Sequence, residues 1–587
     1  MSAPRGDGNQ LDQAKKLFQE GLAAQQTGMW NVAEEKYRCA LVLVPGRSSI
    51  VCNLGVLLLQ QQRADEALGL CEQLVFTEPE NTVALTLMGN CLAMLGRSEQ
   101  ALTAFERALA CRPQLADTFS GRGNLLMNMG RIEEALGDYD EALRIQPKGV
   151  GENYNRARAL SLLGRQQEAL QAYSSVLAMQ PDYVSAWNNM ANIHYDLGRD
   201  AEAAECFSQV ISLDPNHAKA HTGLGLVRQE QWRLDDAARQ YELALAADRN
   251  AAEAHHNRAI LRLFRMQLDD TWPDYEYRIC SSQARKTLRP TAASLEQFTA
   301  MPRWRGPGEV VEGGVGIWSE QGIGDQVLFS TLLPELLTVD GSFIYEVDRR
   351  LLGAYQRAYP RCRFVALQEP AAEELRTAGA ALLAGSLPGL LRGKKESFVR
   401  QPRRLLGALP ERVAHYRDRL GTGLKVALSW RSTRAGRLGR SKSATLAQFA
   451  PLFGISGARF VDVQYGDTAA ERTALAREHG AQIVHFDEVD CYNDLEEVLA
   501  ILEACDLLIT TSNANAHFAG ALGKPVWLLY PSERAPFHYW AHGGDHRCLW
   551  YPSVEIISGP ELTDWKLLVK HAAEKLAAAV ADNRRRD

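Results

Sequence analysis

The sequence has no long apolar run, no paired-cysteine motif and no strong excess of either charge. The 587-residue chain contains no stretch of 18 apolar residues, so no membrane-spanning helix is expected. The opening residues, MSAPRGDGNQLDQAKK, include no apolar segment of the kind that a secretory signal needs. A net charge of −6 argues against an extended nucleic-acid surface. The 11 scattered cysteines contain no C-x-x-C pair, which favours reduced core thiols in a cytoplasmic protein.

Signatures of metal and nucleotide-cofactor binding are also missing. No D-x-D pair follows an expected strand in the second half, and no His/Cys cluster has ligand spacing, so we expect no metal. The stretch WSEQGIGDQVLF, which begins at Trp318, contains Gly322 and Gly324 after an apolar run. Val327 stands where a dinucleotide-binding motif has its third glycine, and no Gly-Lys-Ser/Thr follows. No cofactor is therefore expected.

A 34-residue repeat fills the first half of the chain. Prolines recur at 45, 79, 113, 147, 181 and 215, and an alanine precedes each by 12 residues. An aromatic residue or a cysteine follows each alanine by four positions, and a seventh copy has Ala237 and Tyr241. This period is typical of tetratricopeptide repeats (TPR), in which paired helices stack into an α-solenoid. We expect each aromatic to pack into the next helix, and we expect Trp272, Tyr275 and Tyr277 to cap the last one.

The predicted solenoid has a concave face suited to an extended peptide or a partner helix. Several asparagines recur along the predicted helices, although asparagine is a poor helix former. Their amides are suited to holding a peptide backbone irrespective of its side chains; the alternative is that they are merely solvated helix positions. The candidates are Asn90, Asn124, Asn155, Asn188, Asn189, Asn192 and Asn257.

From Gly314 onwards, apolar strands alternate with helices. This order predicts two parallel sheets covered on both faces, with a break near residue 410 and a cleft between two lobes. Ligands in such folds bind beyond the carboxyl ends of the strands. The expected strands include VGIWS, GSFIYEV, RFVAL, KVALSW, RFVDVQ, AQIVHF, DLLITTS and KPVWLLYP. We expect a TPR region over 1–283, a first lobe over 284–410 and a second over 411–587.

The glycine turn before Asp325 is the first candidate site. Gly322 and Gly324 permit a tight strand-to-helix turn and the close approach of a ligand. Asp325 lies near the helix start, where it is either a general base facing the cleft or a helix N-cap.

The loop SWRSTRAGRLGRSKS, residues 429–443, is the second. Arg431, Arg434, Arg437, Arg440 and Lys442 concentrate positive charge after a strand, which suits a phosphate or carboxylate. Arg431 and Lys442 lie nearest the flanking elements; the alternative is an exposed basic loop. After the next strand, Gln464 and Tyr465 are placed either to contact a base or ribose or to serve the fold alone.

The stretch TTSNANAHFAGALGKP, residues 510–525, is the third. A strand delivers Thr511, Ser512 and Asn513 to a helix start, where free N–H groups and the helix dipole favour an anion. Asn515 and His517 follow in the first turn, and His517 is placed to donate to a phosphate. Alternatively, Ser512 or Asn513 caps the helix and His517 is a core histidine.

These blocks together resemble the GT-B glycosyltransferases of the ADP-heptose transferase type. The shared features are two Rossmann-like lobes, G-x-G-D after the first strand, S-W-R opening the second lobe, and A-H-F-A-G-A-L-G-K-P after a late strand. TPR-fused members also have Y-E-x-R (Tyr275 to Arg278), E-Q-G-I-G-D and S-L-P (Ser386 to Pro388). The combination is similar to protein O-GlcNAc transferases in architecture and to bacterial enzymes that modify flagellin with nonulosonic acids such as pseudaminic acid.

The resemblance implies roles for particular residues. The family's proposed catalytic aspartate falls on Asp325, and its donor-binding block falls on Ser512 to His517. His517 is retained, but Ser512 stands where the family has an acid and Asn513 where it has a hydroxyl. The lost carboxylate argues against ADP-heptose and suits a donor that carries its own carboxylate, such as a CMP-activated nonulosonic acid.

The leading hypothesis is a metal-independent, inverting protein O-glycosyltransferase that modifies Ser or Thr of flagellin held in the TPR groove. One alternative is a TPR scaffold or secretion chaperone with inactive transferase lobes. The other is a transferase acting on lipopolysaccharide or another glycan.

Overall fold

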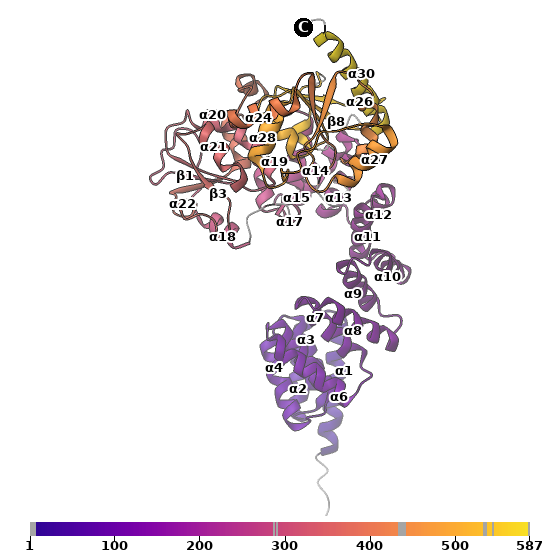
Figure 1. The fold of residues 1–587 in the computed structure, drawn as a ribbon. Helices are drawn as coiled ribbons and strands as arrows, with labels where there is room; N and C mark the ends of the chain where they lie inside the picture. Colours follow the sequence, from indigo (N-terminus) through magenta and orange to yellow (C-terminus); the bar gives the residue numbers. More distant parts are fainter. Residues whose placement is uncertain are drawn as a thin grey trace, which may run out of the picture. The chain divides into compact units, whose positions relative to one another are not determined.

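The structure is a computed structural model, and it describes residues 7–285, 288, 292–432, 442–531, 537–542 and 545–584. The chain divides into two compact units, Met1–Pro215 and Asn216–Asp587 (Figure 1). The described part of the first unit is helical, whereas the second combines helices with two parallel sheets. Within the described ranges, no helix is both long enough and apolar enough to cross a membrane.

The first unit is a run of helix pairs joined by short turns. The repeat of 34 residues places two helices in each period, and successive helices pack against each other. These helices are α1 (Asp7–Gln26), α2 (Trp30–Leu43), α3 (Ser48–Gln60), α4 (Ala64–Thr77), α5 (Thr82–Met94), α6 (Ser98–Cys111), α7 (Ala116–Asn128), α8 (Ile132–Ile145), α9 (Val150–Leu162), α10 (Gln166–Met179), α11 (Val184–Asp196) and α12 (Asp200–Leu213).

A glycine facing an aromatic ring sets the spacing within several pairs. A Cβ added at Gly123 of α7 would lie 2.8 Å from Tyr139 Cε1 of α8, and one at Gly89 of α5 would lie 2.7 Å from Phe105. The aromatic therefore packs on the preceding helix of its own pair. Only Phe105, among these contacts, also reaches the next pair, at Gly121 of α7. The expectation that each aromatic packs into the next helix is therefore incomplete: Phe105 and Tyr173 do contact the helix that follows, but the glycine contacts lie within a pair.

The turn inside each helix pair requires a left-handed residue. Gly96, Gly130, Gly164 and Gly198 occupy this position with φ between 74° and 77°. Gln62 has the same position in an earlier pair, with φ of 62°. A side chain there is strained, because its Cβ crowds the following carbonyl oxygen.

Exchanging the residues at two of these turns tests this account. Gln62→Gly is expected to raise the free energy of unfolding by about 0.5–1 kcal/mol, because relief of strain exceeds the entropy lost by a more flexible unfolded chain. Gly96→Gln is expected to lower it by about 1 kcal/mol. Both positions are exposed, so packing changes little. Thermal and urea unfolding of the full chain measure both; a lower midpoint for Gln62→Gly would contradict the strain argument.

The second unit begins with the last repeat helices. These and the segments up to the first sheet are α13 (Ala218–Glu230), α14 (Leu234–Ala247), α15 (Ala252–Phe264), α16 (Trp272–Tyr275), η1 (Glu276–Ile279), α17 (Ser282–Arg285) and α18 (Ala292–Ala300). The first sheet region comprises β1 (Val315–Trp318), α19 (Ile323–Phe329), η2 (Ser330–Leu332), α20 (Leu333–Leu336), β2 (Phe343–Val347), η3 (Arg349–Leu351), α21 (Leu352–Ala358), β3 (Arg363–Ala366), α22 (Glu373–Arg376), β4 (Ala380–Leu383), η4 (Ala384–Ser386), α23 (Leu387–Leu391) and η5 (Lys395–Arg400).

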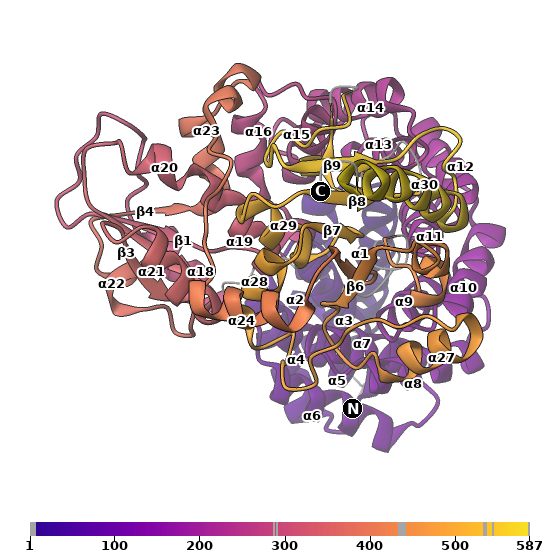
Figure 2. The same cartoon turned by 45° about the horizontal axis from the view of Figure 1, so that its top comes forward.

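The second sheet region follows from Pro410. Figure 2 shows the two regions side by side, with β1, β3 and β4 in one and β6 to β9 in the other. The elements are α24 (Pro410–Leu420), β5 (Leu424–Ser429), η6 (Leu446–Phe449), α26 (Ala450–Phe453), β6 (Ala458–Asp462), α27 (Ala469–His479), α28 (Leu495–Ala504), β7 (Leu507–Thr510), α29 (Ala514–Ala521), β8 (Val526–Leu529), η7 (His538–Trp540), β9 (Val554–Ile557) and α30 (Trp565–Arg584).

Both sheets are parallel, with strand orders β3-β2-β1-β4 and β6-β5-β7-β8-β9. The register pairs Val315 with Phe343 in the first sheet and Val426 with Leu507 in the second. The apolar runs chosen as strands form these sheets, with one exception. AQIVHF, residues 481–486, was expected to be a strand, but only Val484 bridges to β6. The short β9 was not expected.

The last repeat helix shares a hydrophobic core with the sheets. Ala259 and Leu263 of α15 belong to the same buried cluster as Ile317 of β1 and Leu508 of β7. Trp272 adds a polar contact, because its indole Nε1 donates to the Gly393 carbonyl at 3.2 Å. This shared core joins α15 to the sheets, and α14 and α13 follow because α14 packs against α15 and α13 packs against α14.

Candidate functional site

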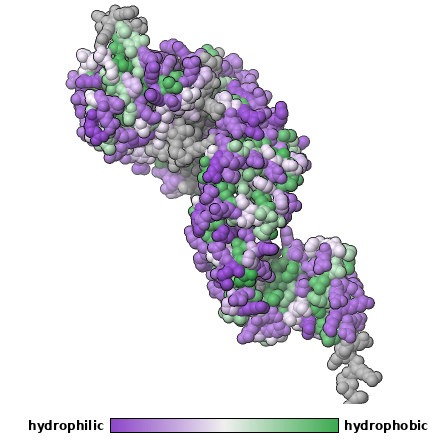
Figure 3. Space-filling model, turned by 90° about the vertical axis from the view of Figure 1, so that its right-hand side faces the viewer, coloured by the Kyte–Doolittle hydropathy of each residue, from purple (hydrophilic) through white to green (hydrophobic). Residues whose placement is uncertain are grey.

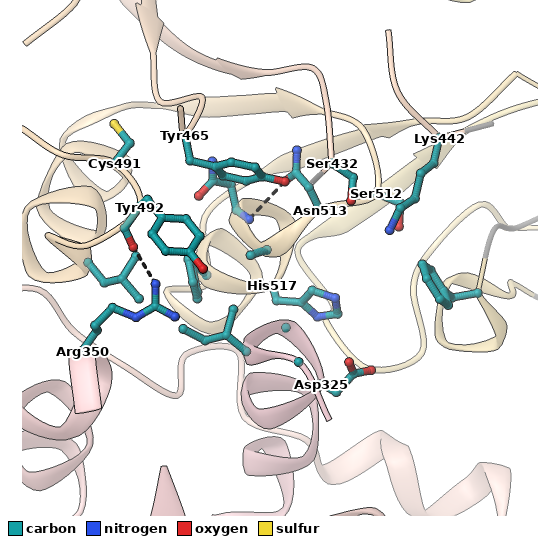
Figure 4. A pocket seen from close by; sticks show the side chains of 18 of the residues that line it. Asp325, Arg350, Ser432, Lys442, Tyr465, Cys491, Tyr492, Ser512, Asn513 and His517 are labelled. Carbon is teal, nitrogen blue, oxygen red and sulfur yellow. Dashed lines mark hydrogen bonds between the residues drawn. The ribbon is translucent and has the colours of Figure 1, made fainter. Parts of the chain in front are cut away.

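One open cavity in the second unit is lined by residues from both sheet regions. It encloses about 910 Å³ of empty space, part of which is open solvent. Figure 4 shows Asp325 and His517 directed toward this space, with Tyr465, Tyr492 and Arg350 on one side and Lys442 on the other. Across the described ranges, no group of three His, Cys, Asp or Glu side chains is placed to hold a metal ion. The lining residues are Gly322, Ile323, Gly324, Asp325, Arg350, Ser432, Lys442, Tyr465, Cys491, Tyr492, Leu495, Ser512, Asn513, Ala514, Asn515, His517, Phe518, Phe537 and Tyr539.

The turn between β1 and α19 brings Asp325 to the cavity. Gly322 is the N-cap of α19, with φ of −61° and ψ of 167°, so Asp325 lies inside the first turn and is not the cap. A Cβ on Gly324 would lie 2.8 Å from His517 Cδ2 and 3.2 Å from its Nε2. Gly324 is therefore needed for the contact between α19 and α29, and this contact brings Asp325 and His517 together.

His517 is a buried histidine in the first turn of α29. Its side chain is 3% exposed, and its Nδ1 lies 3.1 Å from the Tyr551 hydroxyl. Burial, reinforced by the charge of Lys442, lowers the pKa of His517 to about 3. The ring is therefore neutral at physiological pH. When Tyr551 donates to Nδ1, the proton is on Nε2, which lies on the α19 side and is able to donate an uncharged hydrogen bond.

The start of α29 is polar and tightly held. Asn513 is the N-cap: its Oδ1 accepts from the Asn515 amide at 3.1 Å, and its Nδ2 donates to Ser429 Oγ at 2.8 Å. Asn515 Nδ2 donates to the Val463 carbonyl at 2.8 Å. Ser512 Oγ accepts from the Trp540 indole at 3.0 Å. Asn513 and Ser512 thus have structural partners as well as a place in the cavity wall.

Thr511 occupies a different environment. It is fully buried, and its Oγ1 has no hydrogen-bond partner among the described residues. It is not among the described residues that line the cavity.

The two cations singled out from the basic loop have different surroundings. Arg431 forms an ion pair with Glu471 and donates to the Asp467 carbonyl at 2.8 Å, and the described cavity lining does not include it. Lys442 lines the cavity; it is 5% exposed, and its Nζ lies 4.6 Å from the centroid of the Phe537 ring. The remaining candidates, Arg434, Arg437 and Arg440, lie outside the described residues.

Gln464 and Tyr465 follow β6 and hold the loop after β5. Gln464 Oε1 accepts from the Trp430 and Arg431 amides at 2.8 and 2.9 Å, and Gln464 is not among the described residues that line the cavity. Tyr465 donates to the Arg431 carbonyl at 3.0 Å, and its ring also lines the cavity.

Arg350 and Tyr492 line the cavity but were not among the residues predicted from the sequence. Arg350 follows β2, pairs with Asp348 at 2.8 Å and donates to the Tyr492 carbonyl at 2.6 Å. Its guanidinium lies 4.9 Å from the centroid of the Tyr492 ring. Asp325, Arg350 and Lys442 are the charged side chains of the described lining, so cations outnumber carboxylates. The strand-end rule applied to β2 would have identified Arg350.

The asparagines of the repeats divide into bonded and exposed groups. Asn124 Oδ1 accepts from Tyr139 at 2.8 Å and from Asn155 at 3.0 Å, and Asn189 donates to Tyr154 and Tyr173. The Asn155–Asn124 bond and the two bonds of Asn189 link neighbouring helix pairs, whereas the Tyr139–Asn124 bond lies within one pair. Asn192 is exposed and Asn90 half-buried, whereas Asn188 Oδ1 is buried with no partner in the described chain. The space-filling view in Figure 3 shows a mainly hydrophilic face with hydrophobic residues interspersed. Asn257 belongs to the second unit, where it is buried.

Comparison with known families bears on the helical repeats. Profiles described as tetratricopeptide repeat match residues 18–81, 58–119, 116–148 and 184–217, and one described as TPR repeat matches 157–198. The chain carries tetratricopeptide repeats. This confirms the prediction made from the 34-residue period.

One curated relative is Protein FlbA of Caulobacter vibrioides, which is 30% identical over 278 residues. The match takes in 44% of this chain and 46% of FlbA, so less than half of either protein is compared.

Similar solved structures include YrrB, described as a TPR protein with an unusual peptide-binding site. It is 20% identical, with a TM-score of 0.30, and the match covers 32% of this chain and 97% of YrrB. A tetratricopeptide repeat protein from Parabacteroides merdae is 19% identical, with a TM-score of 0.33, over 43% of this chain and 99% of that one. Such low scores carry no argument about function.

The low pKa of His517 predicts a particular pH dependence of stability. Between pH 6.5 and about 3 the unfolded chain binds a proton that the folded site excludes, so stability falls as the pH is lowered from 6.5. This group alone contributes at most about 1.4 kcal/mol per pH unit. His517→Gln should flatten the curve of unfolding free energy between pH 6.5 and 5. His571→Gln, at an exposed position of α30, is the control. Equal slopes for His517→Gln and the unsubstituted protein would contradict a neutral buried ring.

Proposed function

We propose that the chain is a glycosyltransferase of the GT-B type that transfers a sugar from a nucleotide donor to Ser or Thr of a protein. The transfer is metal-independent and inverts the anomeric carbon. The observation that carries the proposal is the shared cavity, in which Asp325 from one sheet region faces His517 and Lys442 from the other. Two parallel sheets that present loops to one cavity supply the place where donor and acceptor meet.

The reaction follows from the positions of these groups. The Asp325 carboxylate takes the proton of the acceptor hydroxyl. The hydroxyl oxygen attacks the anomeric carbon of the donor sugar, and the bond from that carbon to the donor phosphate breaks. Lys442 and the first turn of α29 stabilise the negative charge of the leaving nucleotide. His517, neutral at this pH, donates a hydrogen bond without adding a second positive charge.

The charge of the cavity favours a donor that carries a carboxylate. Arg350 and Lys442 both line it, while the acid that the resembling transferases carry is replaced by Ser512. A CMP-activated nonulosonic acid such as pseudaminic acid fits this balance, since two cations and one carboxylate, that of Asp325, line the described part of the cavity. We therefore favour CMP-sugars over UDP-sugars as donors.

The acceptor proposal rests on the repeats. Asn90 and Asn192 are accessible, and the bonded Asn124–Asn155 pair extends the amide surface between repeats. We propose that this surface holds the acceptor polypeptide, and we propose flagellin as that acceptor because of the resemblance to transferases that modify flagellin.

One observation favours a second function, a TPR scaffold or secretion chaperone with inactive lobes. The polar side chains of Ser512 and Asn513 already bond to Trp540, Asn515 and Ser429, as they would if they served only the fold. A transferase acting on lipopolysaccharide or another glycan would use the same cavity with a different acceptor.

A transfer assay separates these functions. The full-length protein is incubated with flagellin or with a glycan and with CMP-, UDP-, GDP- or ADP-sugars, and products are read by intact mass. A mass increase on the polypeptide that requires a CMP-sugar supports the proposal. Polypeptide binding without a mass increase under any donor indicates the scaffold, and an increase confined to the glycan indicates the third function.

The base role of Asp325 predicts a selective loss. Asp325→Asn should lower the transfer rate about 100- to 10,000-fold, because the amide accepts no proton, while acceptor and nucleotide affinities stay within a few-fold. Asp340→Asn, an exposed position of the same sheet region, is the matched control and should leave the rate unchanged. Full activity in Asp325→Asn would exclude it as the base.

A further inference from the structure

An ionic cluster centred on the buried Arg278–Glu320 pair joins three distant segments of the second unit beside the glycine turn. Arg278, from η1, is 0% exposed; its Nε donates to Glu320 Oε2 at 2.9 Å and its Nη2 to Glu320 Oε1 at 3.2 Å. The same Nη2 donates to Ser386 Oγ at 2.8 Å. Glu276 completes the cluster, accepting from Arg278 Nη1 and from Ser386 Oγ, each at 2.9 Å. These residues lie between the repeats and β1, directly after β1, and directly after β4.

The cluster leaves Glu320 little freedom. Its carboxylate accepts both parallel bonds of the guanidinium, a geometry that fixes the plane of the group. Gly385 lies against the same carboxylate: a Cβ there would lie 1.8 Å from Glu320 Oε1 and 3.3 Å from Arg278 Nη2. The Arg278 guanidinium also lies 4.6 Å from the centroid of the Tyr275 ring. Glu320 is thus held by groups from the repeat cap and from the end of β4.

Glu320 stands immediately before the site. Two residues later Gly322 starts α19, and its N-cap position has no side-chain hydrogen bond to anchor it. Gly324 then meets His517, and Asp325 faces the cavity. Glu320 is fixed before the turn, and the contact between Gly324 and His517 limits the turn at its other end. Asp325 therefore has little room to move.

The net stabilisation that a buried ion pair provides does not by itself explain why Arg278 and Glu320 are paired here. Removing an arginine and a glutamate from water costs about as much as their attraction returns, and apolar residues of similar size often stabilise a fold equally well. What the pair adds over apolar packing is directional: it specifies one position for the backbone at Glu320.

We infer that the Arg278–Glu320 pair is a positioning device through which the end of the repeat region fixes the Gly322–Asp325 turn. Arg278 and Glu320 are positioning residues, since neither lines the cavity among the described residues. The effect on the turn stands on geometry alone, whereas its effect on transfer rests on the proposed function.

The test compares this pair with a second ion pair of a buried arginine in the same sheet region. Arg392, 1% exposed, donates to Glu335 at 2.7 Å, to Gln401 at 2.8 Å and to the Thr331 carbonyl at 2.6 Å, none of which belongs to the Gly322–Asp325 turn. The variants are Glu320→Gln and Arg278→Lys, with Glu335→Gln and Arg392→Lys as controls. Hydrogen exchange of the backbone amides of residues 321–329 is measured in the full chain, with thermal unfolding as a check of folding.

The expected result is local. Glu320→Gln and Arg278→Lys should speed exchange in residues 321–329 by roughly tenfold or more, with the amides of β1 unchanged, whereas the controls should leave 321–329 unchanged at a similar loss of thermal stability. Transfer turnover should fall on the order of 100-fold in the first pair, because a displaced base loses its alignment, with nucleotide affinity within about twofold.

Three results would overturn the inference: exchange over 321–329 that matches the unsubstituted protein, exchange that rises equally in the controls, or failure of both Glu320→Gln and Arg278→Lys to fold. The third would mean that the pair supports the whole unit and not the turn. If the unsubstituted protein transfers no sugar, the proposed function fails, and the exchange measurement still decides the inference.

Discussion

The close approach of α19 and α29 is the constraint on which the candidate site depends. It exists because Gly324 has no side chain: a single added carbon would lie 2.8 Å from the His517 ring. Through this contact the loops at the ends of two separate sheets become the walls of one cavity. The same use of an absent side chain sets the distance between paired helices of the repeats, where Gly89 and Gly123 meet aromatic rings.

The two ends of the Gly322–Asp325 turn are held by different kinds of interaction. Van der Waals contact with a neutral, buried His517 limits one end, and directional ionic bonds from Arg278 limit the other. Neutrality of His517 matters for this arrangement, since Lys442 is close enough to contribute to its low pKa. A second positive charge in the same buried space would oppose the first.

Much of the fold could be predicted from the sequence because its signals are periodic. The 34-residue spacing specified the repeats, and short apolar runs between helical segments specified most strands. AQIVHF failed as a strand because only Val484 pairs with β6, and pairing partners cannot be read from a single segment. At the site, Asp325, Lys442, Tyr465 and His517 were identified from strand ends and reach one cavity. Arg431 and Gln464 have the right positions in the chain, yet Glu471 and nearby amides engage them, and only three-dimensional neighbours decide that.

Because α13 to α15 belong to the same unit as the sheets, they decide where this chain can be divided into two parts. α15 shares a core with the sheets, α14 packs against α15, and Arg278 lies just beyond α15. The boundary between the two units therefore lies at Pro215, between α12 and α13, and not at the end of the 34-residue repeat. Helical repeats taken from another repeat protein would have to be joined at this boundary, so that α13, α14 and α15 remain with the sheets.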